Sequence, residues 1–138
     1  MTPIFVDTSA WDAIADVNDK DHILALQFRD EVPGRFRLFT LNYVLDELYT
    51  LLLMNIGYQG TVAFKTRLDL LVSEDVLEVI WITDDLASRA WDTFERFNVD
   101  KQWSFTDCTS CVVMKDADIR EAFAFDHHFE QMGFVLRP

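Results

Sequence analysis

Short apolar runs alternate along the chain with stretches of helical periodicity, and this alternation predicts a parallel β-sheet with helices on its faces. The first run, Ile4-Phe5-Val6, is too short for a helix and suits a strand that is buried on both faces. Further strands are expected at 36–39, 76–82, 121–125 and 134–136. The chain is therefore predicted to have an α/β fold.

Helical periodicity fills the segments between these strands. Ser9 followed by Asp12 indicates a helix N-cap with its reciprocating acid, and Gly57 is expected to end a strongly apolar helix. No internal repeat, low-complexity segment or linker interrupts the pattern, so a single domain over residues 1–138 is expected. The predicted helices span 10–17, 41–54, 62–72, 86–97 and 104–115, with a short helical turn at 127–132. A further helix, capped by Asp19 or Asp21, is expected to run through Phe28.

The composition is that of a folded globular protein, with 50% hydrophobic residues, 12 Phe and 4 Trp. No apolar run is long enough for a membrane span and no secretory signal is recognised, so neither is expected. Cys108 and Cys111 lie three positions apart on a predicted helix, which is not a disulfide framework and indicates a reducing cytoplasm. The tryptophans are expected mostly in the core, with Trp103 also a candidate for stacking on a base: Trp11, Trp81, Trp91 and Trp103.

The charge is strongly acidic, with 24 Asp and Glu against 12 Lys and Arg and a net charge of -12. Such a surface repels phosphate backbones at long range and excludes nonspecific coating of DNA. It is compatible with a site that uses a cation, or with a basic protein partner. A nucleic-acid substrate would need a local basic rim or a bound metal ion.

Several acids are predicted to lie at the ends of strands or at the start of a helix. Asp7 and Asp126 each follow an apolar strand, and ligands of open α/β sheets bind at the carboxyl ends of the strands. Asp107 lies in the first turn of a helix that begins at Ser104 or Thr106. Capping alone would explain Asp7 and Asp107, because helix N-termini favour carboxylates.

Glu47 is a fourth candidate, in the middle of an apolar helix where a buried charge is costly unless something neutralises it. Its neighbour Asp46 is the alternative, since adjacent helix positions point about 100° apart. Glu47 lies three residues after Val44 and so borders the apolar stripe, which favours Glu47.

Carboxylates that converge repel one another, by on the order of 4 kcal/mol per pair at 4 Å and an effective dielectric constant near 20. Protons or cations must offset this repulsion. An all-oxygen cluster suits Mg²⁺ or Mn²⁺, which activate water in phosphodiester hydrolysis. His127 and His128 are expected to cap or pack rather than to bind metal.

Four motifs together resemble the PIN-domain family, and within it the VapC-type toxin ribonucleases. The motifs are Val6-Asp7-Thr8-Ser9, Val44-Leu45-Asp46-Glu47-Leu48, Ser104-Phe105-Thr106-Asp107 and Phe123-Ala124-Phe125-Asp126-His127-His128-Phe129. The resemblance implies a three-layer α/β/α sandwich with a mainly parallel sheet, and endonucleolytic cleavage of RNA by metal-activated water. It also implies homodimers and inhibition by a small antitoxin protein.

Carried over by position, the catalytic and metal-binding acids are Asp7, Glu47, Asp107 and Asp126, with Mg²⁺ or Mn²⁺ as the cofactor. Thr8 or Ser9 would hydrogen-bond a carboxylate or the substrate phosphate. The main alternative is a non-catalytic acidic α/β module for binding or phospho-acceptor signalling. A phospho-acceptor domain would require a pair of adjacent acids near the first strand. A PIN-like scaffold without activity and a haloacid-dehalogenase-like phosphatase are further alternatives.

Overall fold

Five parallel strands form the centre of the computed structural model, which describes residues 1–138. Their order across the sheet is β3-β2-β1-β4-β5, and each neighbouring pair is parallel. The predicted α/β class with a parallel sheet is confirmed. The strands are β1 (Thr2–Val6), β2 (Phe36–Leu41), β3 (Leu77–Ile80), β4 (Glu121–Phe123) and β5 (Val135–Arg137).

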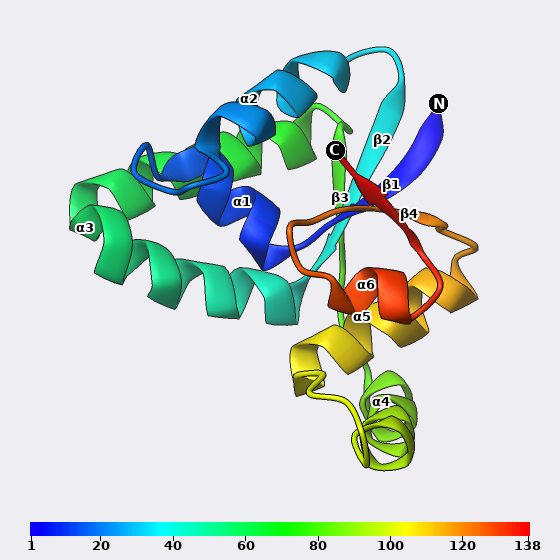
Figure 1. Cartoon of the computed structure of the whole chain (residues 1–138). Helices are drawn as coiled ribbons and strands as arrows, with labels where there is room; N and C mark the ends of the chain where they lie inside the picture. The colour runs from blue at the N-terminus through cyan, green and yellow to red at the C-terminus, as the bar shows by residue number, and fades with distance from the viewer.

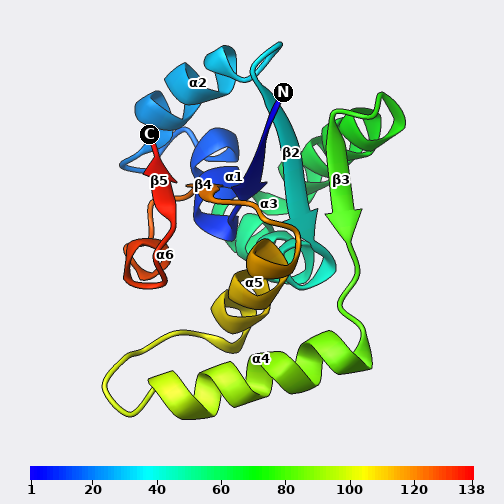
Figure 2. The same cartoon turned by 90° about the vertical axis from the view of Figure 1, so that its right-hand side faces the viewer.

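Six helices cover the two faces of the sheet. Figure 1 shows α1, α2 and α3 on one side and α4, α5 and α6 on the other, which is the predicted three-layer arrangement. Helix α4 packs against α5 and extends away from the sheet (Figure 2). The helices are α1 (Thr8–Ala15), α2 (His22–Glu31), α3 (Asn42–Ser73), α4 (Asp84–Phe97), α5 (Phe105–Asp116) and α6 (His128–Gln131). None of them is both long and apolar enough to cross a membrane.

The apolar residues of β1 are buried on both faces of the sheet, as the sequence predicts. Phe5 lies 6.1 Å from Phe129 between ring centroids, and on the neighbouring strand Phe123 lies 4.6 Å from Phe28. Because both ends of these contacts are in the core, they fix β1 and β4 against the two helical layers.

Of the helix boundaries that differ from the predictions, those at the start of α1 and in the middle of α3 change the interpretation. The N-cap of α1 is Asp7, whose side chain accepts from the backbone N–H of Ser9, so the predicted Ser9 cap is wrong. The predicted helices at 41–54 and 62–72 join in α3, bent at Gly57, where φ is 81°. Gly57 interrupts the helix as predicted, because a left-handed φ favours glycine.

The tryptophans divide between core and surface. Trp11 and Trp103 are buried, but Trp81 and Trp91 are 71% and 51% exposed, so the expectation of a core position is wrong for these two. Trp91 lies on α4, which packs mainly against α5, and Trp81 follows the end of an edge strand. Trp103 packs on Phe97 and donates its ring N–H to Gln131, so its role is structural.

The strand order reverses between β1 and β4. From β1 the chain adds β2 and β3 on one side, and then returns across the sheet to place β4 on the other side of β1. Ligands of open α/β sheets bind in the crevice outside the carboxyl ends of the strands at such a switch point. The segments that follow β1 and β4 therefore define where a site is expected.

Replacing Leu48 by alanine tests the packing of α3. Leu48 is fully buried, whereas Leu53 on the same helix is 55% exposed. We expect Leu48→Ala to lower the free energy of unfolding by about 3 kcal/mol, from lost burial and a residual cavity, and Leu53→Ala to change it by less than about 0.5 kcal/mol. Urea denaturation measures both, and equal losses would contradict the packing described.

Candidate active site

Asp7 is held at the end of β1 by the backbone and by Ser9. Its backbone N–H donates to the carbonyl of Phe123 on β4 at 3.0 Å, and its carboxylate accepts from the Ser9 hydroxyl at 2.8 Å. The Ser9 oxygen in turn accepts from the backbone N–H of Phe125 at 3.0 Å. Ser9 therefore fixes the carboxylate of Asp7 and ties it to the segment that follows β4.

Asp107 is positioned by the N-terminus of α5. Ser104 is the N-cap, and its hydroxyl accepts from the Asp107 backbone N–H at 3.0 Å while the Asp107 carboxylate accepts from the Ser104 N–H at 3.3 Å. This capping box selects Ser104 between the two predicted caps. The side chain of Asp107 is only 9% exposed, so its carboxylate is both fixed and largely dehydrated.

Asp126 lies beyond the end of β4, which stops at Phe123 rather than at the predicted residue 125. Its carboxylate accepts from the backbone N–H of His128 at 2.9 Å. The His128 ring nitrogen Nδ1 lies 3.2 Å from Asp126 and 2.8 Å from Asp107. One imidazole thus joins two acids that come from different elements.

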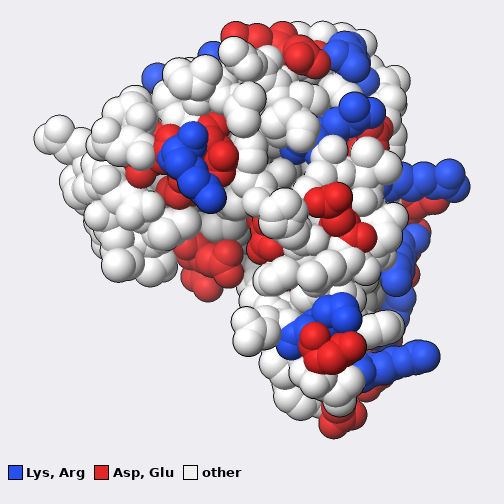
Figure 3. Space-filling view, viewed as in Figure 1, with Lys and Arg blue, Asp and Glu red and all other residues white.

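The four predicted acids line one open hollow of about 740 Å³ at the switch point of the sheet. Three further acids and one amine, that of Lys20, also line it, while Asp46 lines a neighbouring depression instead. Figure 3 shows acidic side chains gathered in the notch between α3 and the α5–α6 layer. The acids that line the hollow are Asp7, Asp12, Asp19, Asp21, Glu47, Asp107 and Asp126.

Glu47 belongs to this hollow but is exposed. The premise that its charge is buried among apolar residues is therefore wrong, although the preference for Glu47 over Asp46 agrees with the geometry. No hydrogen bond joins Glu47 to Asp7, Asp107 or Asp126. It reaches the hollow from α3.

Burial and like charge shift the titration of the two innermost acids. Dehydration, together with the nearby charge of Asp107, raises the pKa of Asp7 from 3.8 to about 7, against the opposing hydrogen bonds from Ser9. Burial likewise raises the pKa of Asp107, and the hydrogen bond from His128 opposes that rise. The site therefore disfavours full ionisation in the absence of a compensating cation.

The donor atoms suit a hard divalent cation. One ligand atom each from Asp107, Asp126 and His128 lies within 4.8 Å of the others. Thr8, which also lines the hollow, is buried, and its hydroxyl has no hydrogen-bond partner within the protein. Carboxylates with a free hydroxyl nearby are typical of sites for Mg²⁺ and Mn²⁺ with their coordinated water.

Sequence reasoning missed His128. Both histidines after Asp126 are expected from the sequence to cap or pack. In the structure, however, the His128 ring faces Asp107 and Asp126. The position of His128 two residues after a predicted ligand is the signal that could have identified it. His127 points elsewhere, is 86% exposed and contacts Glu130. Cys108 and Cys111 are free and buried, as expected of structural helix cysteines.

The chain belongs to the PIN-domain family, since the family model for the PIN domain matches residues 4–135. It is 37% identical over 137 residues to the 23S rRNA-specific endonuclease VapC20 of Mycobacterium tuberculosis, covering 98% of each chain. A VapC ribonuclease of Archaeoglobus fulgidus is 30% identical over 118 residues, covering 85% of this chain and 70% of the relative. The predicted family is confirmed.

Solved structures agree with this assignment. The crystal structure of VapC20, described as a sarcin-ricin loop cleaving toxin, superposes with a TM-score of 0.85 at 35% identity and covers 98% of this chain and 99% of that one. FitAcB of Neisseria gonorrhoeae matches with a TM-score of 0.71 at 11% identity, covering 98% of this chain and 96% of that one, and shares the fold. Family membership favours the nuclease over the phospho-acceptor and dehalogenase alternatives.

Replacing Asp7 by asparagine tests how much the ionised Asp7 carboxylate destabilises the folded protein. The pKa of Asp7 is raised on folding, so the folded state retains a proton that the unfolded chain loses between about pH 4 and pH 7. The parent therefore loses stability as the pH rises through this window, and Asp7→Asn does not share that loss. We expect Asp7→Asn to be more stable than the parent at pH 7.5 in EDTA, by on the order of 2 kcal/mol.

Urea denaturation at several pH values measures this difference, which should shrink toward pH 4. Asp46→Asn, an exposed neighbour of Glu47 outside the hollow, is the control and should follow the parent. A constant difference between Asp7→Asn and the parent from pH 4 to pH 7.5 would contradict the raised pKa.

Proposed function

We propose that this chain is a metal-dependent endoribonuclease, the toxin of a toxin–antitoxin pair, which cleaves RNA by metal-activated water. The observation that carries the proposal is the convergence of Asp7, Glu47, Asp107 and Asp126 on one hollow at the switch point of a PIN-domain sheet. Relatives over nearly the whole chain are named as endonucleases or ribonucleases, which supports the same reaction class here.

The four acids would hold Mg²⁺ or Mn²⁺ as oxygen ligands. When bound, such an ion polarises a phosphoryl oxygen and lowers the pKa of a coordinated water. The protein's own residues contribute position: Ser9 orients the Asp7 carboxylate, and the capping box with Ser104 orients that of Asp107. Thr8 is placed to hydrogen-bond a water or a substrate phosphate, since its buried hydroxyl has no partner within the protein.

The proposed substrate is a structured loop of ribosomal RNA. The support is the likeness over 98% of both chains to a protein named as 23S rRNA-specific. Lys20 is the only lysine or arginine that lines the hollow, and it forms no ion pair. Its amine is therefore available to a phosphate, and it lies on the loop between α1 and α2 at the rim.

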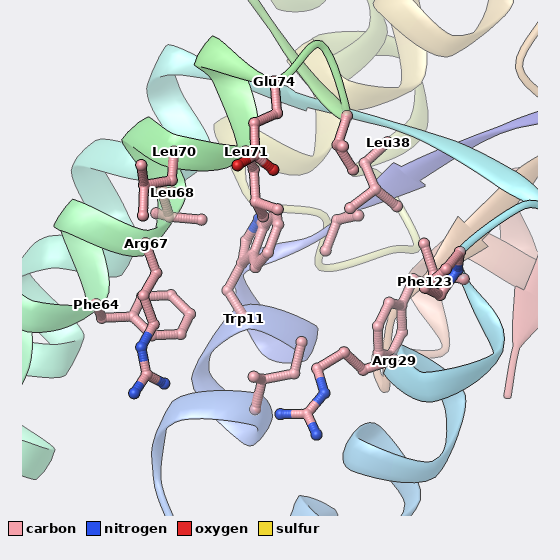
Figure 4. Close-up of a pocket in the computed structure, with 15 residues that line it drawn as sticks. Trp11, Arg29, Leu38, Phe64, Arg67, Leu68, Leu70, Leu71, Glu74 and Phe123 are labelled. Atoms are coloured by element: carbon pink, nitrogen blue, oxygen red, sulfur yellow. The ribbon is translucent and has the colours of Figure 1, made fainter.

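The proposed antitoxin site is a separate apolar cavity of about 420 Å³ between α1, α2 and the second half of α3. Figure 4 shows the Trp11 ring inside it, the guanidinium groups of Arg29 and Arg67 on one side, and Glu74 on the opposite side. An amphipathic segment with apolar residues for the cavity and a carboxylate for the arginines fits this chemistry. The net charge of -12 favours basic residues elsewhere on that partner.

We also propose a homodimer in the cytoplasm, built from this single domain. Trp91 on α4 is stacked on Phe94 with ring centroids 5.1 Å apart and remains half-exposed, and Trp81, in the segment between β3 and α4, is also exposed. Exposed aromatic surface of this kind is typical of protein contacts, and a second copy is the proposed partner for it. The buried free thiols of Cys108 and Cys111 are compatible with a reducing compartment.

Replacing Asp107 by asparagine tests the nuclease proposal. The substitution keeps the shape of the side chain but removes the charge that would bind the ion, so we expect cleavage of a sarcin–ricin-loop RNA oligonucleotide in Mn²⁺ to fall by roughly 10³-fold or more. Asp7→Asn should behave likewise, and Asp46→Asn should cleave at the parental rate. The proposal fails if Asp107→Asn retains parental cleavage, or if the parent does not cleave RNA in Mg²⁺ or Mn²⁺.

Replacing Leu70 by aspartate tests the antitoxin site. Leu70 lines the apolar cavity and is 54% exposed, so the fold should tolerate the change, while Val72 nearby on the same helix is 45% exposed and does not line it. We expect Leu70→Asp to weaken binding of the proposed antitoxin by about tenfold or more, because a charge must be buried. Titration calorimetry measures the affinity. Unchanged binding by Leu70→Asp, or an equal loss in Val72→Asp, would exclude this site.

A further inference from the structure

The imidazole of His128 faces two of the acids that line the hollow, Asp107 and Asp126. Its Nδ1 lies 2.8 Å from a carboxylate oxygen of Asp107 and 3.2 Å from one of Asp126. The side chain is 29% exposed, and its backbone N–H donates to Asp126. The ring is thus held in place by the residue whose carboxylate it faces.

A hydrogen bond explains only part of this arrangement. A neutral imidazole whose Nδ1 carries the proton has one N–H there, which can make one well-aligned bond, yet two carboxylates approach the same nitrogen. In an octahedral ion site with bonds of about 2.1 Å, neighbouring ligand atoms are roughly 3.0 Å apart. The two distances from Nδ1 lie on either side of that spacing, and all three ligand atoms lie within 4.8 Å of one another. Each carboxylate oxygen therefore has the separation from Nδ1 that neighbouring ligands of one ion have.

We infer that His128 supplies a nitrogen ligand, through Nδ1, to the ion held by Asp107 and Asp126, and that this makes the site prefer Mn²⁺ to Mg²⁺. The inference rests on the metal-dependent function proposed above and specifies its cofactor. Mg²⁺ favours oxygen ligands and keeps its water, whereas Mn²⁺ accepts an imidazole more readily. A site built of carboxylates alone would discriminate less between these two ions.

The neighbouring histidine provides a matched control. His127 also lies at the rim of the hollow, but its ring is 86% exposed and contacts Glu130 rather than Asp107 or Asp126. Replacing either histidine by glutamine removes one imidazole from the same segment. The two substitutions therefore differ in whether the lost nitrogen faces the acids.

The test measures ion binding to the full chain without RNA. Loss of the free Mn²⁺ signal in electron paramagnetic resonance gives the Mn²⁺ affinity, and competition gives that of Mg²⁺. We expect His128→Gln to weaken Mn²⁺ binding by about tenfold or more while Mg²⁺ binding changes by less than about threefold. His127→Gln should match the parent for both ions. An unchanged ratio of the two affinities in folded His128→Gln overturns the inference.

Pulsed electron paramagnetic resonance of bound Mn²⁺ needs no change at His128. The His127→Gln protein should show nitrogen coupling, and labelling its histidines with ¹⁵N should change that coupling from the ¹⁴N to the ¹⁵N pattern. Bound Mn²⁺ without nitrogen coupling overturns the role of His128 and leaves the nuclease proposal intact if RNA is cleaved. A parent that binds neither ion overturns both.

Discussion

The buried carboxylate of Asp7 is the constraint on which the site depends. Its backbone N–H extends the pairing between β1 and β4 and fixes its main chain, and the Ser9 hydroxyl holds its carboxylate. Burial and the charge of Asp107 raise its pKa to about 7, which means that the domain holds an unfavourable charge near neutral pH. For a marginally stable domain this is a substantial cost, and a bound cation is the simplest way to offset it.

The convergence of the acids around Asp7 follows from strand order rather than from any local motif. Because β4 pairs with β1 on the side away from β2, the segments that carry Asp7 and Asp126 leave the sheet side by side. The N-terminus of α5 then brings Asp107 to the same edge, and α3 brings Glu47 from the opposite layer. The four segments that carry these acids are separate in sequence. They line one hollow only because the chain crosses back over the sheet between β3 and β4.

Sequence reasoning predicted the parts of this picture that depend on strand ends and helix starts. Asp7, Asp107 and Asp126 were recognisable because apolar strands and a capping box place them. The exposure of Glu47 was not recognisable from the sequence. A residue at the border of an apolar helix stripe can be either covered by another layer or open to solvent, and the pattern does not distinguish the two. The exposure of Trp91 was missed for a related reason: the spacing of aromatics indicates a packed helix face, but α4 packs mainly against α5. His128 was missed because its partner Asp107 is distant in sequence and meets it only in the fold.

The acidity of the chain limits how RNA can approach, and it ties substrate binding to ion binding. At physiological salt, charges farther than about 8 Å from a phosphate are largely screened, so the net charge of -12 matters less than the groups at the hollow. There, seven carboxyl groups face one amine, that of Lys20. A phosphate that enters before any cation meets repulsion from fixed acids that cannot move away. A cation that enters first meets preformed ligands and reduces that repulsion at the point where the backbone must bind. Under the proposed function, RNA affinity therefore depends on the ion before it depends on base contacts.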